Sequence, residues 1–212
     1  MPFRIEQKYR INKYKLPYLY SWIGKNNGEK IYLDRFIHSI YFDNYKLSLY
    51  HESVEGLVPR KKIRLRSYQK NINKFENSKL ETKINSVEGR YKESKKADSP
   101  LKILRNGILD NKYGLLFPTV QISYQREYYK IFNIRITIDT KIKYKKYNRN
   151  FINRHSYDEN DVILEAKSQT KDISMYNYID ENIFFEKIRF SKYCNAIEKV
   201  FFVNWFVVLK RC

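Results

Sequence analysis

The segment RKKIRLRSY, at residues 60–68, contains the side chains whose types and spacing most directly suggest chemistry. Side chains of an extended strand alternate between two faces, so the apolar Ile63 and Leu65 share one face. Four cations share the opposite face: Arg60, Lys62, Arg64 and Arg66. Arginine binds two phosphate oxygens with its planar fork, and lysine adds a compact charge. A strand that buries its apolar face therefore directs these cations either to solvent or into a cavity that binds a polyanion.

The same division into an apolar and a charged face recurs in four other segments: 3–10, 79–84, 133–139 and 161–167. Their charged faces mix cations with carboxylates, as in Glu6 with Lys8 and Glu81 with Lys83. An antiparallel sheet with one solvated face would produce this alternation. A closed barrel with a charged interior and helix-covered apolar faces would produce it as well. The alternation alone leaves both interpretations open.

Period-two patterns predict the strands that must position these residues. They cover 3–11, 36–43, 61–68, 79–84, 119–129, 133–139 and 161–168. Helices are predicted over 15–23, 99–115 and 172–182. No long linker and no internal repeat divides the chain, so we expect a single strand-rich α+β domain over residues 1–212.

The charge balance points to a polyanionic partner. Lysine and arginine total 42 against 23 aspartate and glutamate residues, which gives a net charge of +19. Such a surplus favours nucleic acid, phosphates or anionic lipid. The run at 141–150 interleaves cations with aromatic residues, as single-strand nucleic-acid binders do. A solvated strand or loop is the more common origin of a charge run, and we favour that interpretation.

The two cysteines, Cys194 and Cys212, provide neither a disulfide framework nor the spacing of a zinc site, which fits a reducing cytoplasm. The first residues contain no apolar signal-peptide core. The longest apolar run, at 200–209, is interrupted by Asn204 and is shorter than the roughly 20 residues that a spanning helix needs. We therefore expect a cytoplasmic protein without a transmembrane segment.

Eight short motifs occur in an order that resembles a known family. They are RIEQKY near the start, SIYFDN (39–44), RKKIRLRSY (60–68), LETK (80–83), YQREYY (124–129), IRITID (134–139), ILEAK (163–167) and FSKY (190–193). Together they resemble the VTC-type polyphosphate polymerase domain, a branch of the CYTH-like triphosphate tunnel metalloenzymes, from about residue 3 to residue 196. This resemblance implies an eight-stranded antiparallel β-barrel, a triphosphate tunnel with a polar, basic lumen and helices packed outside.

The resemblance also implies roles for individual residues. Those that would bind the phosphates of the substrate are Lys8, Arg60, Lys62, Arg64, Arg66, Lys83, Arg90, Arg126, Arg135, Ser191 and Lys192. Those of the set that would act in catalysis are Arg64, Arg66, Lys83, Arg126 and Lys192. Glu165 would be the principal ligand of Mn²⁺ or Mg²⁺, with Glu6 and Glu81 as further ligands. Arg90, together with Lys92, would lie near a mouth of the tunnel.

The activity implied is polyphosphate polymerisation, in which the γ-phosphate of ATP is transferred to a growing inorganic polyphosphate chain. Tunnel triphosphatases begin with Glu-x-Glu-x-Lys, whereas here Arg4 replaces the first acid, which favours the polymerase branch. A metal-dependent triphosphatase differs mainly in using water as the nucleophile and stays an alternative. A non-catalytic polyphosphate- or RNA-binding module is a second alternative. The expected partners are ATP and inorganic polyphosphate or triphosphate, with no specific nucleic acid.

Overall fold

The computed structural model describes residues 5–69, 75, 77–148, 155–168, 174–182 and 185–202. In these residues eight strands are eight or more residues long: β1 (Ile5–Asn12), β2 (Glu29–Asp43), β3 (Arg60–Ser67), β4 (Lys79–Ser86), β5 (Gly89–Lys96), β7 (Gly114–Ile131), β8 (Ile134–Lys146) and β10 (Asp161–Ser168). Three short strands accompany them: β6 (Ile108–Asp110), β9 (Tyr157–Asp158) and β11 (Glu186–Lys187).

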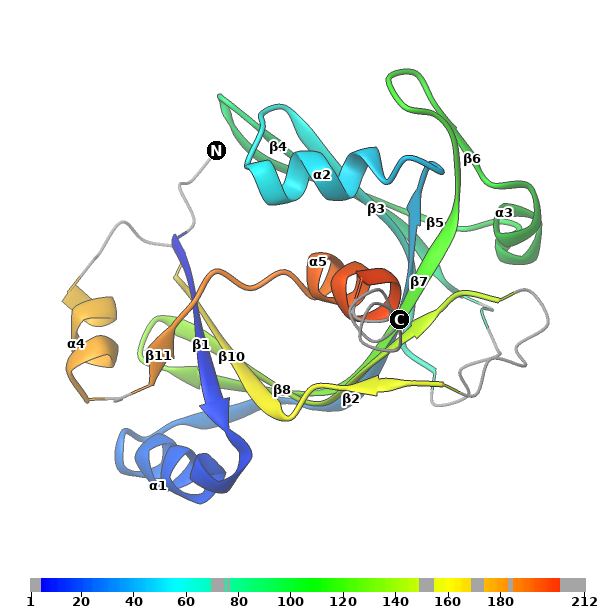
Figure 1. Cartoon of the computed structure of the whole chain (residues 1–212). Helices are drawn as coiled ribbons and strands as arrows, with labels where there is room; N and C mark the ends of the chain where they lie inside the picture. Colours follow the sequence, from blue (N-terminus) through cyan, green and yellow to red (C-terminus); the bar gives the residue numbers. More distant parts are fainter. Residues whose placement is uncertain are drawn as a thin grey trace, which may run out of the picture. The chain divides into compact units, whose positions relative to one another are not determined.

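The described residues form five α-helices (Figure 1): α1 (Leu16–Lys25), α2 (Ser48–Glu55), α3 (Pro100–Asn106), α4 (Ser174–Asn182) and α5 (Lys192–Ile197). The first four connect strands, and α5 follows the last strand. A short helical turn, η1 (Lys13–Lys15), precedes α1, and a wider turn, η2 (Glu198–Phe202), follows α5. Among the described residues, no helix combines the length and the apolar character needed to cross a membrane.

The strands form one sheet in the order β11-β1-β10-β8-β7-β2-β3-β4-β5, with β6 paired to β7 and β9 paired to β8. The pairings with a resolved register are antiparallel, including β1 with β10, β10 with β8, and β2 through β5 in succession. The prediction of an antiparallel α+β fold with eight principal strands is confirmed.

The chain divides into two compact units. Unit 1 contains residues Met1–Arg35, Tyr124–Ile142 and Glu159–Phe190, and unit 2 contains Phe36–Ser123, Lys143–Asp158 and Ser191–Cys212. The long strands β2, β7 and β8 each contribute residues to both units.

The core of unit 1 lies on the apolar face of β1, β10 and β8. The strands supply Tyr9, Ile11, Ile134, Ile136, Ile138, Val162, Leu164 and Ala166, which are all buried. Helices α1 and α4 cover this face with Leu19, Trp22 and Ile23 from α1 and Tyr176 and Ile179 from α4. The predicted alternation along 133–139 and 161–167 is confirmed, since the isoleucines of β8 and the apolar positions of β10 share one face.

The core of unit 2 lies on the apolar face of β2 and β3. Its members are Ile40, Phe42, Leu49, Ile63, Leu65, Phe75, Ala97, Leu104 and Leu116, drawn from strands β2, β3 and β7, helices α2 and α3, and loops. Ile40 pairs with Leu65 and Phe42 with Ile63 across the two strands. The apolar face of segment 60–68 is therefore buried under helices, as one of the two sequence interpretations requires.

Several elements differ from the sequence prediction. The predicted helix over 99–115 ends at Asn106, because Gly107 adopts a positive φ of 82° that terminates it, and the hairpin of β6 and β7 follows. Strand β5 was not predicted, since its residues GRYKESKK are exposed or only half-buried and carry no apolar alternation. Helix α2 was not predicted either. Of the apolar run at 200–209, the described part is the end of η2, where Val200 is buried.

Candidate active site

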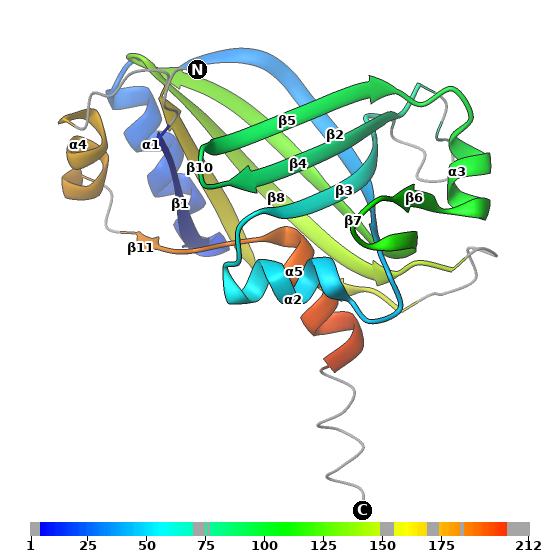
Figure 2. The same cartoon turned by 90° about the horizontal axis from the view of Figure 1, so that it is seen from above.

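Strands β3, β4 and β5 of unit 2 lie side by side (Figure 2). Their polar face is an array of cations, here called the basic face. Residues directly opposite each other in antiparallel strands point to the same side of the sheet. The register therefore sets four rows on one face: Arg60, Asn85 and Arg90; Lys62, Lys83 and Lys92; Arg64, Glu81 and Ser94; and Arg66, Lys79 and Lys96. Nine of these twelve side chains are cationic and one is acidic. The face opposite contributes Ile63 and Leu65 to the core.

Glu81 organises the centre of the basic face. Its Oε2 accepts hydrogen bonds from Arg64 at 2.8 Å, and its Oε1 accepts one from Lys92 at 2.6 Å. Arg66 lies 3.6 Å from Oε2. The Glu81 side chain is only 3% exposed. Burial alone would raise its pKa, but the neighbouring Arg66, Arg64 and Lys92 lower it from 4.5 to about 2. The carboxylate is therefore ionised at neutral pH and holds the two arginines in place.

Tyr41 of β2 borders the basic face beside Arg64, with which it is paired in register. Its hydroxyl accepts a hydrogen bond from Arg64 at 2.7 Å. Burial would raise the pKa of this phenol, but Arg64, Arg66 and Lys62 outweigh that effect and lower it. The ring of Tyr41 stacks on Tyr193 with centroids 5.0 Å apart. Tyr41 therefore fixes one side of the Arg64 guanidinium while Glu81 fixes the other.

Helix α5 brings the FSKY motif to this face. Ser191 is its N-cap and accepts a hydrogen bond from the backbone of Cys194 at 3.3 Å, and Lys62 donates to the same hydroxyl oxygen at 2.8 Å. Lys192 is the first residue of the helix. Unlike α2 and α3, α5 lies on the polar side of β2 and β3, as the contact between Lys62 and Ser191 requires.

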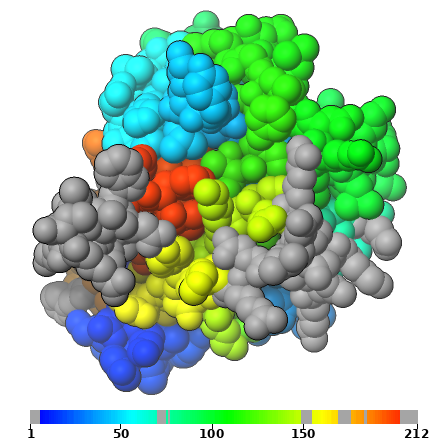
Figure 3. Space-filling view, turned by 45° about the vertical axis from the view of Figure 1, so that its right-hand side comes forward, coloured from blue at the N-terminus to red at the C-terminus, as the bar shows by residue number. Residues whose placement is uncertain are grey.

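Buried contacts hold α5 in this place. Asp43, at the end of β2, accepts hydrogen bonds from the backbone of Leu49 and Tyr50, both at 3.0 Å, and from the hydroxyl of Tyr193. Helix α2 lies beside α5 and η2 (Figure 3), where the Tyr50 ring contacts Phe202 at 5.7 Å. Asp43 therefore has a structural role, joining α2 to α5.

Arg60 lies at the edge of the basic face and is engaged elsewhere. Its Nη1 donates hydrogen bonds to the carbonyl oxygens of Gly56 at 2.9 Å and Leu57 at 2.8 Å. These carbonyls follow α2, so Arg60 closes the loop that connects α2 to β3. Arg90 is exposed and lies opposite Asn85 at the turn of the β4–β5 hairpin.

The polar face of β1, β10 and β8 in unit 1 mixes both signs of charge and is here called the mixed face. The register aligns Glu6 with Lys167 and Lys167 with Arg135, and it aligns Lys8 with Glu165 and Glu165 with Thr137. Every cation of these rows is therefore beside or diagonal to a carboxylate. The mixed face differs in this respect from the basic face, where Glu81 alone faces nine cations.

Glu165 of β10 is a buried carboxylate of the mixed face, with a side chain only 8% exposed. Its Oε1 forms an ion pair with Lys167, and Arg126 lies 3.8 Å from its Oε2. Burial would raise the pKa of Glu165, but Lys167, Arg126 and Lys8 hold it well below its usual range. Lys167 also lies 3.5 Å from Glu6. The Lys167 ammonium thus joins the carboxylates of Glu6 and Glu165.

Arg126 of β7 is held by Asp139 of β8. Its Nε and Nη2 donate to the two carboxylate oxygens at 2.5 and 2.7 Å, a bidentate arrangement. Asp139 is fully buried. Lys8 donates to the carbonyl oxygen of Phe190 at 2.8 Å, next to the FSKY motif.

The donors present fit a divalent ion that is shared with phosphate. In the described part of the chain, no group of three or more acidic, histidine or cysteine side chains converges to form a complete metal cage. Mg²⁺ is commonly bound by only one or two carboxylates together with substrate phosphates and water. Glu6 and Glu165 form such a pair, joined by the same lysine. The described contacts of Glu81, by contrast, give both of its oxygens to cations.

The predicted site residues therefore fall into two groups. Unit 2 contains Lys62, Arg64, Arg66, Glu81, Lys83, Ser191 and Lys192, with Arg60 and Arg90 at the edge of its basic face. Lys8, Arg126, Arg135, Glu6 and Glu165 belong to unit 1. Sequence reasoning did not assign roles to Tyr41, Lys79, Lys96 or Lys167. The motif SIYFDN contains Tyr41 at the right period, but Lys79 and Lys96 become neighbours only through the hairpin register.

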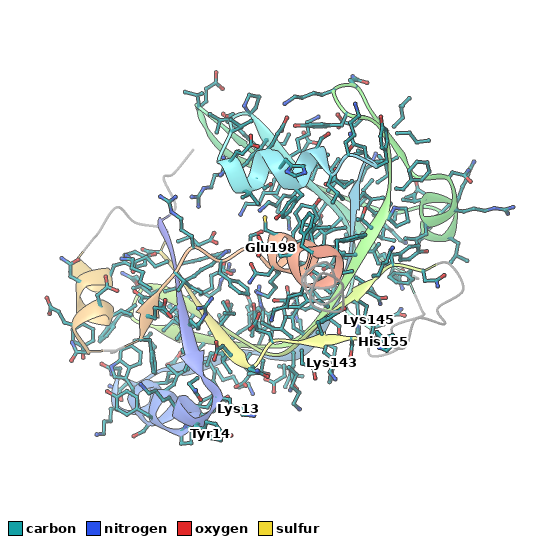
Figure 4. All side chains as sticks on the ribbon, in the orientation of Figure 1. Lys13, Tyr14, Lys143, Lys145, His155 and Glu198 are labelled. Atoms are coloured by element: carbon teal, nitrogen blue, oxygen red, sulfur yellow. The ribbon has the colours of Figure 1, made fainter. Side chains whose placement is uncertain are left out.

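Residues 141–146 of the basic run form the end of β8, where Figure 4 labels Lys143 and Lys145, and residues 149 and 150 lie outside the described residues. Lys143 lies 3.5 Å from Asp158, while Tyr144 is fully buried. Base-stacking platforms need accessible aromatic faces, and Tyr144 has none. The described part of this run is an ordinary strand with a solvated charged side, which agrees with the interpretation favoured from the sequence.

Comparisons with known proteins identify the family. The family model described as "VTC domain" matches residues 3–112 and 104–201. No curated protein matches the chain in sequence. A candidate adenylate cyclase from Bacillus halodurans is 12% identical, with a TM-score of 0.61 over 95% of this chain and 100% of that one. A candidate adenylyl cyclase from Hippeastrum, described as having a dominant triphosphatase activity, is 13% identical, with a TM-score of 0.57 over 93% and 97% of the two chains.

A chain of the Mediator head module of Schizosaccharomyces pombe is 8% identical, with a TM-score of 0.55 over 87% of this chain and 96% of that one. Likenesses at such low identity show a common fold and do not by themselves assign an activity. The family match covers nearly the whole chain and agrees with the tunnel-type fold of the structural neighbours. The chain therefore belongs to the VTC domain family, within the CYTH-like superfamily of triphosphate-tunnel enzymes.

Proposed function

We propose that this protein is a polyphosphate polymerase, which transfers the γ-phosphate of ATP to the end of an inorganic polyphosphate chain. The observation that carries the proposal is the basic face, where nine cations are opposed by a single carboxylate. A nucleoside triphosphate brings only about four negative charges at neutral pH, so one nucleotide would leave much of this face uncompensated. A nucleotide together with a polyphosphate chain would compensate it.

Phosphoryl transfer asks a protein to position its reactants and to stabilise the charge of the transition state. Arg64 and Arg66 are suited to hold phosphate oxygens, because Glu81 fixes both guanidinium groups before the substrate binds. Charges oriented in advance stabilise the transition state without reorganisation during the reaction. Lys83 and Lys192 add further cations, and Ser191 offers its hydroxyl proton to a phosphate oxygen beside them.

On the mixed face, Arg126 is proposed as the cation that contacts the transferred phosphoryl group. Its bidentate bond to Asp139 fixes the guanidinium plane, and neither of these two hydrogen bonds uses Nη1. Lys8 and Arg135 would contribute charge from the neighbouring strands β1 and β8. Arg60, whose Nη1 binds the carbonyls of residues 56 and 57, and Arg90 would contribute at the edge of the basic face.

Tunnel enzymes of this superfamily depend on a divalent metal. We propose that Glu165, with Glu6, holds Mn²⁺ or Mg²⁺ together with substrate oxygens, as the donor pair described above allows. The ion, when bound, would supply Lewis-acid chemistry to the phosphate of the substrate. The role of Glu81 as a metal ligand stays a prediction, and its contacts favour a role in orienting Arg64 and Arg66. We also propose, as the sequence predicts, that residues 1–212 form a single domain and that the protein acts in the cytoplasm.

Incubation of the purified protein with ATP and Mn²⁺ tests the proposal. We expect ADP and long-chain polyphosphate, visible as a ladder on a urea–polyacrylamide gel that disappears after exopolyphosphatase treatment. Release of orthophosphate in place of polyphosphate would overturn the polymerase in favour of a hydrolase. Binding without any turnover of ATP would favour the non-catalytic polyanion-binding module. Parallel reactions use Arg66→Ala and, as a control, Arg105→Ala in α3. If the basic face is the active site, the first variant should lose activity and the second should keep it, although each removes one positive charge.

A metal-dependent triphosphatase is the second candidate. One specific observation favours it: the carboxylates of Glu6 and Glu165 are joined by Lys167 on the mixed face, where they could activate water. The Hippeastrum neighbour is described as a triphosphatase, although its likeness to this chain shows the fold alone. Hydrolysis of tripolyphosphate to orthophosphate with Mn²⁺, without chain growth, is the result expected of this alternative.

A further inference from the structure

An exposed tyrosine and an exposed arginine contact each other in the first part of β2, in unit 1. The register of β2 with β3 covers residues 38–42, and residues 32–36, which precede it, are all exposed. Tyr32 is 51% exposed. The Arg35 guanidinium lies over the Tyr32 ring, 5.3 Å from the ring centroid. This part of β2 therefore exposes a flat ring together with a flat cation.

Tyr128 of β7, the strand next to β2 in the sheet, supports this pair. Its ring is perpendicular to the Tyr32 ring, with centroids 5.5 Å apart. The Arg35 guanidinium also lies 5.5 Å from the Tyr128 centroid, so the cation contacts both rings. Tyr128 itself is only 9% exposed. The three residues are here called the Tyr32 platform. Because a buried ring holds the two exposed groups, they lose little conformational freedom when a ligand binds.

Strand β7 connects the Tyr32 platform with the proposed phosphate contact of unit 1. Side chains two residues apart in a strand share a face, so Tyr128 lies on the same side of β7 as Arg126. The two residues are about 7 Å apart along the strand. The Arg126 guanidinium lies 5.3 Å from the ring centroid of Tyr124, two residues further along the same face. A nucleotide whose phosphates contact Arg126 can therefore reach the platform with its base.

The chemistry of the Tyr32 platform suits a nucleobase. Bases stack on the faces of aromatic side chains and on the guanidinium plane of arginine. Stacking needs accessible flat groups, and Tyr32 and Arg35 are both exposed. An inorganic phosphate chain has no ring to stack and would gain only the charge of Arg35. The platform therefore favours the component of ATP that tripolyphosphate and polyphosphate lack.

We propose that Tyr32 and Arg35, supported by Tyr128, form a subsite that binds the base of the nucleotide donor. The inference rests on the proposed function, because it takes Arg126 as a contact of the donor's phosphates. A purine has two fused rings and covers more of a stacking surface than a pyrimidine, so the subsite prefers purines. It makes the protein distinguish the nucleotide, which donates the phosphoryl group, from the inorganic chain, which accepts it.

The experiment compares Tyr32→Leu with the control Tyr14→Leu. Tyr14 is another exposed tyrosine of unit 1, and Lys13 lies over its ring, 5.2 Å from the centroid. Each variant therefore removes an exposed ring that contacts a cation, and neither changes the charge. Affinities for ATP, CTP and tripolyphosphate are measured by isothermal titration calorimetry with EDTA present. This omits metal-dependent turnover, so the result does not depend on which reaction the protein catalyses.

We expect Tyr32→Leu to weaken the binding of ATP about tenfold, which is within the range for stacking of one base on an aromatic ring. The loss for CTP should be smaller, and the affinity for tripolyphosphate should not change. Tyr32→Phe keeps the ring and should keep the affinity for ATP. Tyr14→Leu should bind all three ligands as the wild type does.

Three results would overturn the subsite. One is an equal loss of affinity for ATP and tripolyphosphate in Tyr32→Leu, and another is a loss for ATP no larger than in the control. The third is a loss in Tyr32→Phe as large as in Tyr32→Leu, which would exclude stacking. An equal loss for ATP and CTP would refute the preference for purines. A wild type that shows the expected dependence on Tyr32 but makes no polyphosphate from ATP would refute the proposed polymerase and leave the subsite in place.

Discussion

The substitution Glu81→Gln tests whether one buried carboxylate holds the cations of the basic face. It keeps the side-chain volume and an acceptor oxygen but removes the negative charge that Arg64, Arg66 and Lys92 share. Since the Glu81 side chain is 3% exposed, water replaces little of the lost interaction. The cations would then repel one another across β3, β4 and β5.

The magnitude follows from the pKa of Glu81, which its neighbours lower from 4.5 to about 2. A shift of this size corresponds to about 3 kcal/mol of folding free energy. Glutamine still accepts one hydrogen bond, and Lys92 is half exposed, so we expect a loss of about 2 kcal/mol at pH 7. For a chain of this size that is a fall of roughly 4–8 °C in melting temperature.

The pH dependence has a definite sign. A carboxyl group whose folded pKa is depressed stabilises the fold above its unfolded pKa, and the contribution is lost as the pH falls through the folded value. The gap in stability between wild type and E81Q should therefore be complete at pH 7 and should shrink to roughly half by pH 3. Thermal unfolding followed by circular dichroism between pH 3 and pH 7 measures this gap.

Glu93→Gln is the matched control. Glu93 lies on the neighbouring strand, is exposed, and points to the opposite side of the sheet, where it pairs with Thr82. Tripolyphosphate should raise the melting temperature of E81Q at least as much as that of the wild type, because more positive charge is left for it to neutralise. The rate constant for turnover of ATP should nevertheless fall about tenfold, since Arg64 and Arg66 are no longer oriented in advance. Equal stabilities of E81Q and E93Q, or a gap that stays constant with pH, would refute the role assigned to Glu81.

Three further outcomes are expected. Glu165→Gln should weaken Mn²⁺ binding, followed by electron paramagnetic resonance with tripolyphosphate present, by about tenfold or more; unchanged binding would exclude Glu165 as a ligand. Lys167→Met should tighten Mn²⁺ binding in the same assay, because the ammonium that joins Glu6 and Glu165 no longer competes with the ion, and weaker binding would contradict that competition. Asp139→Asn should lower turnover about tenfold with a small effect on the KM for ATP, because it weakens the bidentate bond that orients the Arg126 guanidinium. A change confined to KM would contradict a role for Arg126 in the transition state.

Much of the fold was predictable because burial follows the alternation of residue types. The isoleucines of 133–139 and the apolar positions of 161–167 form the unit 1 core, as their period of two predicts. Strand β5 and the end of the helix after Ser99 were missed for physical reasons. The sequence of β5 contains no apolar face that could reveal a strand, and a single glycine with positive φ ended a helix that composition alone would have continued.

The sequence by itself determined which residue types share a face, because side-chain alternation in a strand is a local property of the backbone. It thereby placed Arg60, Lys62, Arg64 and Arg66 opposite Ile63 and Leu65 before any partner strand was known. Only the tertiary structure decided which charges meet, because register and pairing depend on residues far apart in the chain. It showed that Glu81 pairs with Arg64 and Arg66, and that Asp139 pairs with Arg126. It also showed that Lys79 lies opposite Lys96. Each of these contacts decides which ligands its residues can bind.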